Sequence, residues 1–150
     1  MGAKRYFEEF QIGESVTSRS RQICDGDVRL FGGCTNLNYP IYSDAIYCAA
    51  LPGIEKPVVP GALVLNVVDT FFAESVSPDG VPTLHYGYDR VEYKKMVYPG
   101  ECVYSYFEVI GKEEKNEEYG LLIFRVDTYN QKKELVMTHI DKLYVGRQEV

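Results

Sequence analysis

The segment from Pro60 to Ser75 constrains the fold more than any other part of the chain. Its apolar side chains cover nearly the whole circumference of a helix, whereas a helix on a protein surface has one apolar face. Such a helix must be buried, so the rest of the chain has to wrap around it. Pro60 stands where proline is favoured, near the first turn. The apolar residues are Ala62, Leu63, Val64, Leu65, Val67, Val68, Phe71, Phe72 and Ala73.

The wrapping layer is predicted from the second half of the chain. Residues 84–96, 101–112, 119–129 and 135–145 alternate or are rich in β-forming side chains. Short connections between the last three predict antiparallel pairing. With a further strand over residues 16–24, this predicts an α+β fold in which about five antiparallel strands curl around one long buried helix.

Short helices are predicted before the long one. The acidic segment 25–27 is expected to cap a helix over residues 28–33. Ser43 or Asp44 is expected to cap a second short helix that runs through Ala50. No repeat or linker interrupts the pattern, so we expect one domain over residues 1–150.

Composition excludes several classes of function. The net charge of −6, with scattered basic residues, argues against nucleic-acid binding. The longest apolar stretch is too short to span a bilayer, and the first residues lack the apolar segment of a signal peptide, so a cytoplasmic protein is expected. No metal site is predicted, because no C-x-x-C pair occurs and only His85 and His139 are present. The cysteines are Cys24, Cys34, Cys48 and Cys102.

The dipeptide Pro60-Gly61 marks the start of the long helix, which is a candidate anion-binding site. The first N–H groups of a helix have no intrahelical acceptor, and they favour an anion or a developing negative charge. The polar loop over residues 35–44 precedes this step and is a candidate source of groups that move protons.

Five motifs, in order along almost the whole chain, resemble the MaoC-like dehydratase branch of the hot-dog fold, which contains the (R)-specific enoyl-CoA hydratases. Residues 6–13 are similar to its Tyr-Phe-Glu-Asp-Phe-x-x-Gly opening, and residues 29–35 to the helix before its catalytic loop. The others are Pro40-Ile41-Tyr42-Ser43-Asp44 for Pro-Leu-His-x-Asp, Val59-Pro60-Gly61-Ala62-Leu63 for Ala-His-Gly-Met-Leu, and residues 87–101 for a strand pair containing Pro-Val-x-Pro-Gly-Asp.

The resemblance implies a hydratase or dehydratase of an acyl-CoA or acyl-carrier thioester, with coenzyme A as part of the substrate and no other cofactor. It also implies a homodimer or higher homo-oligomer. Gly61 takes the place of the glycine that stabilises the enolate oxygen. Asn38, Pro60 and Ala62 are the substrate-binding candidates around it.

The catalytic pair of the family is not retained. Its motif is Asp-x-Asn-Pro-x-His, and Tyr42 stands at the His position. Aligning on Thr35 places Asn36 opposite the Asp, whereas counting back from Tyr42 reaches Leu37; neither is an acid. An amide orients water but does not accept its proton, and a tyrosine with a pKa of about 10 donates a proton more readily than it accepts one.

Each candidate also has a structural interpretation. Asn36 and Asn38 are typical turn residues. The ring of Tyr42 can pack beside Pro40. Gly61 can serve only to let the helix start close to the sheet.

Asp69 supports a second hypothesis. It follows Gly61 by eight residues, about two helical turns, and some hot-dog thioesterases carry a carboxylate at this spacing. Burial would raise its pKa toward that of a useful base. The structural alternative is a core or dimer-facing carboxylate paired with Arg or Tyr.

Basic residues on the predicted strand over 84–96 are candidates for the phosphates of coenzyme A. Arg90 and Lys94 are expected on one face and Lys95 on the other. Ordinary solvated strand charges are the alternative. Three functions therefore stay open: a hydratase using Asn36, Tyr42 and Gly61, a thioesterase using Asp69, and a non-catalytic acyl-CoA-binding protein.

Overall fold

The long helix is present where the sequence predicts it. In the computed structural model, which describes residues 4–148, α3 spans Gly61–Ser75. Six of its side chains are buried: Leu63, Val64, Val67, Val68, Phe71 and Phe72. The ends of the predicted domain, residues 1–3 and 149–150, lie outside the described residues.

One stripe of α3 is not covered within the chain, which corrects the expectation of burial all round. Ala62, Asn66, Thr70 and Ala73 recur every three or four residues and are exposed. Asp69 lies at the border of this stripe and is half-buried. The sheet therefore wraps one side of the helix and leaves the other open.

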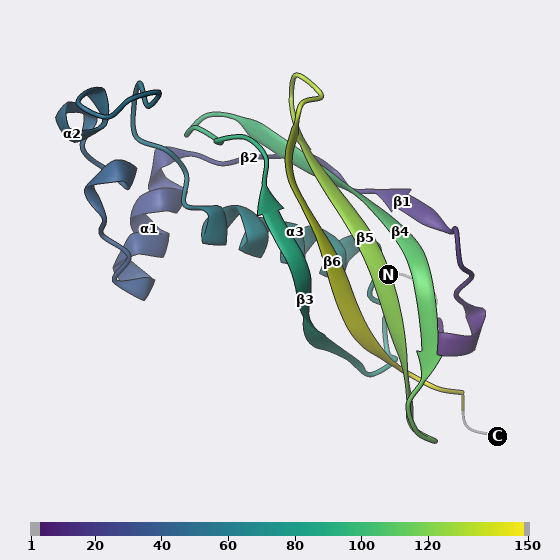
Figure 1. The fold of residues 1–150 in the computed structure, drawn as a ribbon. Helices are drawn as coiled ribbons and strands as arrows, with labels where there is room; N and C mark the ends of the chain where they lie inside the picture. The colour runs from purple at the N-terminus through teal and green to yellow at the C-terminus, as the bar shows by residue number, and fades with distance from the viewer. Residues whose placement is uncertain (1–3, 149–150) are drawn as a thin grey trace.

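The sheet is antiparallel and curls around α3, which confirms the predicted hot-dog arrangement (Figure 1). Its order is β1-β4-β5-β6-β3, with β2 also pairing with β4. The strands are β1 (Ser15–Thr17), β2 (Arg21–Gln22), β3 (Thr83–Tyr93), β4 (Cys102–Glu114), β5 (Tyr119–Asn130) and β6 (Leu135–Gly146).

The expected strand over residues 16–24 is two short strands instead. Both pair with β4, and a side chain takes over the hydrogen bond between them. The Ser105 backbone N–H donates to the Ser18 hydroxyl at 2.9 Å, where a continuous strand would offer a backbone carbonyl. A polar side chain that competes for ladder bonds interrupts a strand in this way.

The core lies between α3 and the concave face of the sheet. Phe72 packs edge-on against Phe107 and Phe124, with ring centroids 5.3 and 4.9 Å apart. Alternate residues of β4 point into this core, among them Val103, Phe107 and Val109. Edge-to-face aromatic pairs add directional packing to the area that they bury, and they fix the height of the helix above the sheet.

Four shorter helices precede the long one in the chain: η1 (Phe7–Glu9), α1 (Asp25–Thr35), η2 (Pro40–Tyr42) and α2 (Ala45–Ala49). The Asp44 carboxylate accepts hydrogen bonds from the N–H groups of Ile46 and Tyr47, which confirms one of the two predicted caps. In contrast, α1 begins three residues before its predicted start. Its N-cap is Cys24, whose backbone N–H donates to the carboxylate of Asp27, so Asp27 lies inside the first turn.

The arrangement leaves the N-terminal end of α3 beyond the edge of the sheet. Helices α1, η2 and α2 gather at this end (Figure 1). Within residues 4–148 there is no helix with the length and apolar character needed to cross a membrane.

Candidate active site

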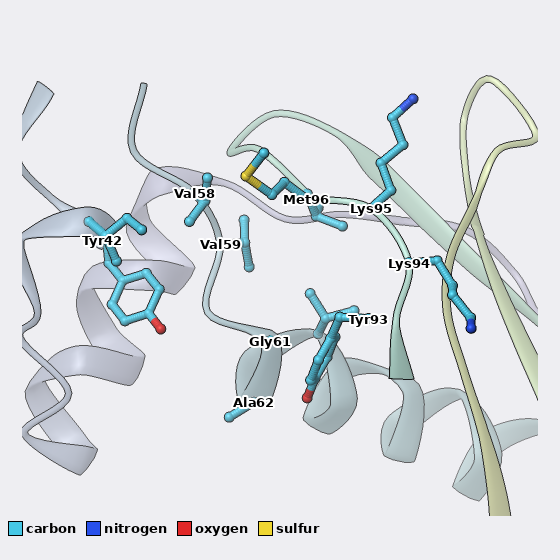
Figure 2. Close-up of a pocket in the computed structure, with 12 residues that line it drawn as sticks. Tyr42, Val58, Val59, Gly61, Ala62, Tyr93, Lys94, Lys95 and Met96 are labelled. Carbon is cyan, nitrogen blue, oxygen red and sulfur yellow. The ribbon is translucent and has the colours of Figure 1, made fainter. Parts of the chain in front are cut away.

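A cavity of about 710 Å³ opens at the N-terminus of α3 (Figure 2). This volume is typical of small-molecule sites. The lining comes from η2, the segment before α3, the start of α3 and the end of β3 with the residues after it. These residues are Ile41, Tyr42, Val58, Val59, Gly61, Ala62, Val64, Tyr93, Lys94, Lys95, Met96 and Val97.

The entry to α3 is fixed by two backbone hydrogen bonds. The N–H of Val58 donates to the carbonyl of Ile41 at 3.1 Å, and the N–H of Val59 donates to the carbonyl of Val97 at 2.8 Å. They join the helix entry to the two walls of the cavity. The position of Gly61 therefore depends on the tertiary fold rather than on local helix propensity.

The helix start is not capped by a side chain, because Pro60 occupies the N-cap. The carbonyl of Pro60 accepts from the N–H groups of Leu63 and Val64. The N–H groups of Gly61 and Ala62 come before the first intrahelical donor, so they have no intrahelical acceptor. This end of the helix carries the positive end of the helix dipole, so it favours a carbonyl oxygen that gains negative charge.

Tyr93 covers Gly61, a contact that the sequence did not predict. A Cβ built on Gly61 would lie 2.6 Å from the Cζ atom of Tyr93, so a larger residue would displace the ring. Burial, with the neighbouring Tyr42 adding to the effect, raises the pKa of Tyr93, which keeps its phenol protonated at neutral pH. No sequence motif singles out Tyr93. It contacts Gly61 because the sheet curls around α3 and brings the end of β3 to the start of the helix.

Tyr42 lines the same cavity from η2. Its ring packs edge-on against Tyr39, with centroids 6.3 Å apart, and is partly buried against the core. Figure 2 shows Tyr42 and Tyr93 on opposite sides of Gly61. Two phenols therefore flank the helix N-terminus.

Asn36 is not part of this cavity. It ends α1 in the left-handed conformation, with φ of 58° and ψ of 24°. Its side-chain oxygen accepts a hydrogen bond from Asn38 at 3.0 Å. Asn38 lines a separate groove of about 250 Å³, which Tyr42 also borders. The arrangement matches the turn-forming interpretation of both asparagines.

The basic candidates are placed differently from expectation. Arg90 has φ of 52° at a β-bulge, and Lys94 follows the end of β3, so strand alternation no longer puts them on one face. Lys94 and Lys95 both border the cavity, but they pair with Glu92 and Glu134. Their side chains extend away from Gly61 (Figure 2).

Asp69 lies about 12 Å along the helix axis from Gly61, at the standard rise, and does not line the cavity. Its two oxygens accept from the hydroxyl of Tyr88, at 2.6 and 2.5 Å, which is the predicted pairing with a tyrosine. Burial raises the pKa of Asp69, the Tyr88 hydrogen bond opposes the rise, and nearby Asp141 adds to it. His85 and His139 lie in the same cluster rather than near Tyr42.

These features define a hot-dog domain whose cavity is built on the N-terminus of its central helix. The family model described as "MaoC like domain" matches residues 9–126. The chain therefore belongs to the MaoC-like domain family. A search of curated protein sequences finds no match.

Solved structures agree on the fold. A monoamine oxidase regulatory protein from Archaeoglobus fulgidus is 24% identical, with a TM-score of 0.89 over 97% of both chains. The R-hydratase PhaJ1 from Pseudomonas aeruginosa is 20% identical, with a TM-score of 0.78 over 95% of this chain and 86% of that one. The (R)-hydratase from A. caviae is 18% identical, with a TM-score of 0.76 over 91% and 97%.

The left-handed conformation of Asn36 leads to the first prediction. Asn tolerates the left-handed conformation better than Ala, because its amide can hydrogen-bond locally, so Asn36→Ala should lower the free energy of unfolding by about 1 kcal/mol. Asn36→Gly removes the same amide without the strain and should stay within about 0.5 kcal/mol of the parent. Urea unfolding at equilibrium measures both. Equal losses in the two variants would show that the amide, not the backbone, matters for stability.

The raised pKa of Asp69 leads to the second prediction. A carboxyl group whose pKa is higher in the folded state favours folding less as pH rises through that range. Asp69→Asn should therefore raise the free energy of unfolding at pH 7.5, and this gain should shrink as pH falls toward 4. The buffer contains a chelator, so that metal ions do not affect the comparison. Urea midpoints across this range give the measurement. Glu117→Gln, at an exposed carboxylate, serves as the control, and destabilisation by Asp69→Asn at pH 7.5 would contradict the prediction.

Proposed function

We propose that this chain is a hydratase or dehydratase that acts on an acyl-CoA or acyl-carrier thioester in the cavity at Gly61. The observation that supports this most is the uncapped N-terminus of α3 between two tyrosine phenols. Membership of the MaoC-like family and the fold shared with R-hydratases support the same class of reaction.

The proposed chemistry adds water across the double bond of an enoyl thioester. The N–H at the start of α3 stabilises the oxygen of the thioester carbonyl as it becomes enolate-like. A phenol protonates the α-carbon, and water delivers its hydroxyl to the β-carbon while its second proton restores the phenol. The product is a 3-hydroxyacyl thioester, and dehydration follows the same steps in reverse.

Tyr42 is the proposed proton donor. It occupies the family position of the histidine, and its ring borders the cavity. Asn36 is not proposed to touch substrate, since it ends α1 outside the cavity. Loss of a positioned acid and base typically costs ~10²–10⁴ in rate, so slow turnover is expected.

The thioesterase hypothesis has less support. Asp69 is bonded to Tyr88 and does not border the cavity of its own chain. Within one chain, a carboxylate about 12 Å along the helix axis from Gly61 does not reach a thioester held there. Binding without turnover is the remaining alternative.

The third prediction tests the reaction and the donor. Enoyl-CoA substrates of several chain lengths should lose their conjugated double bond without release of free thiol. Tyr42→Phe, which keeps the ring, should slow this by about 10²-fold because it removes the proton donor. Tyr39→Phe is the matched control, since the Tyr39 hydroxyl bonds to Tyr47 outside the cavity.

Two outcomes would contradict this proposal. Thiol release without loss of the double bond would identify a thioesterase. Saturable binding of acyl-CoA with neither reaction would identify a non-catalytic binding protein. Equal activity of Tyr42→Phe and the parent would leave the hydratase class intact and remove Tyr42 from the chemistry.

A homodimer is part of the proposal. β3 is the last strand of the sheet, so one of its edges is unpaired, and its exposed Leu84 and Tyr86 are apolar or aromatic. The open stripe of α3 faces solvent as well. As a fourth prediction, sedimentation at micromolar concentration should give twice the chain mass, and Leu84→Lys should shift it toward the monomer. A parent protein that sediments as a monomer would contradict the assembly.

A further inference from the structure

A cluster of polar side chains lies where α3 meets strands β3 and β6, away from the cavity at Gly61. Asp141 and His139 are two residues apart on β6 and point to the same face, toward α3. Each is only 1% exposed. Among the described residues, neither oxygen of Asp141 and neither ring nitrogen of His139 has a hydrogen-bond partner. The ion-pair contacts of Asp141 are with His85 and His139, which are cationic only when protonated. A buried carboxylate that no hydrogen bond satisfies is costly, so a ligand would stabilise this group.

Two other elements bring donor atoms to Asp141. Asp69 comes from α3 and His85 from β3, and one donor atom from each of the three residues lies within 4.8 Å of the others. The Nε2 atom of His85 is 3.0 Å from Oδ1 of Asp141. Ligands about 2.1 Å from one ion lie roughly 3–4 Å from one another, so small side-chain rotations complete such a site.

Charge balance points the same way. Across residues 4–148, no ion pair joins a lysine or arginine to Asp69 or Asp141; the nearby Lys142 pairs with Asp89. Two carboxylates in one largely buried cluster repel each other unless a positive charge lies between them. A bound cation would neutralise both carboxylates and would coordinate the oxygens of Asp141, which accept no hydrogen bond among the described residues.

We propose that Asp69, His85 and Asp141 bind a divalent transition-metal cation. Two carboxylate oxygens and one imidazole nitrogen suit Zn²⁺ or Mn²⁺, and the cluster has no thiolate that would select Cu⁺. The sequence predicted no metal site, because the three residues are dispersed along the chain and meet only in the folded sheet.

The surrounding side chains orient these ligands. The Tyr88 hydroxyl donates to Asp69, and the Tyr88 ring lies against His85, with centroids 4.2 Å apart. The Nε2 atom of His139 is 3.7 Å from Oδ2 of Asp141, on the inner side of the cluster. Such outer contacts fix the geometry of metal ligands. The side chain of His85 is 40% exposed, which gives the ion a route from solvent.

The ion would join α3, β3 and β6, so its binding should stabilise the fold independently of any turnover at Gly61. The fifth prediction uses tag-free protein stripped with a chelator and then dialysed against Zn²⁺ or Mn²⁺. We expect about one ion per chain by elemental analysis. Metal at 100 times its dissociation constant should raise Tm by about 5–10 °C.

Asp141→Asn and His85→Ala should lose both the bound ion and the rise in Tm. Asp89→Asn is the matched control, because it removes one carboxylate from β3 that pairs with Lys142 outside the cluster. In chelator, Asp141→Asn should be at least as stable as the parent, since a neutral amide replaces a buried carboxylate that no hydrogen bond satisfies. That result separates loss of the site from loss of the fold.

The proposal is overturned if the parent retains no more metal than Asp141→Asn and its Tm does not respond. It is overturned equally if Asp89→Asn loses metal as Asp141→Asn does. Hydratase activity is not a readout of this experiment, so the metal site and the proposed reaction stand or fall separately.

Discussion

Burial of α3 under the curled sheet is the constraint on which the rest of the structure depends. The aromatic contacts of Phe72 hold the helix at a fixed height, and the backbone bonds of Val58 and Val59 hold its entry. A buried helix needs its polar ends satisfied, and here the first N–H groups of the helix receive no side-chain cap. The cavity at Gly61 follows from that arrangement, because the packing that fixes the helix also points its open end at the cavity.

The same helix contributes a different kind of polar group two turns after Gly61. At Gly61 it offers backbone N–H donors to an apolar cavity, and at Asp69 it offers a carboxylate to a histidine and a second carboxylate. One rigid element thus serves two places in the molecule that are separated by about 12 Å along its axis. The carboxylates of this second place, Asp69 on α3 and Asp141 on β6, do not border the cavity at Gly61.

The sequence predicted the parts of the fold that periodicity encodes. α3 and the four long strands were found to within a few residues, because apolar burial repeats every 3.6 residues in a helix and every two in a strand. The errors lie where one side chain replaces a backbone partner. Ser18 interrupts the first strand, and Cys24 rather than an aspartate is the N-cap of α1. Neither feature changes the periodicity of apolar residues, so the sequence pattern does not reveal it.

The candidate site was predictable only in part, for a related reason. Gly61 and Tyr42 belong to a motif order, so the resemblance located them, and both border the cavity. Tyr93 and the cluster around Asp141 carry no local pattern, because strands distant in sequence bring them together.

Gly61 shows how the two kinds of information combine. A glycine at a helix start is uninformative alone, but the ring of Tyr93 occupies the space that its Cβ would fill. Any larger residue would displace that ring, so the glycine preserves the position of the phenol beside the helix N-terminus. The two roles considered for Gly61, close packing and stabilisation of an oxyanion, are therefore compatible. Both roles rest on the same place in the cavity wall, where the Tyr93 ring lies against Gly61 and the first N–H groups of α3 lack an intrahelical acceptor.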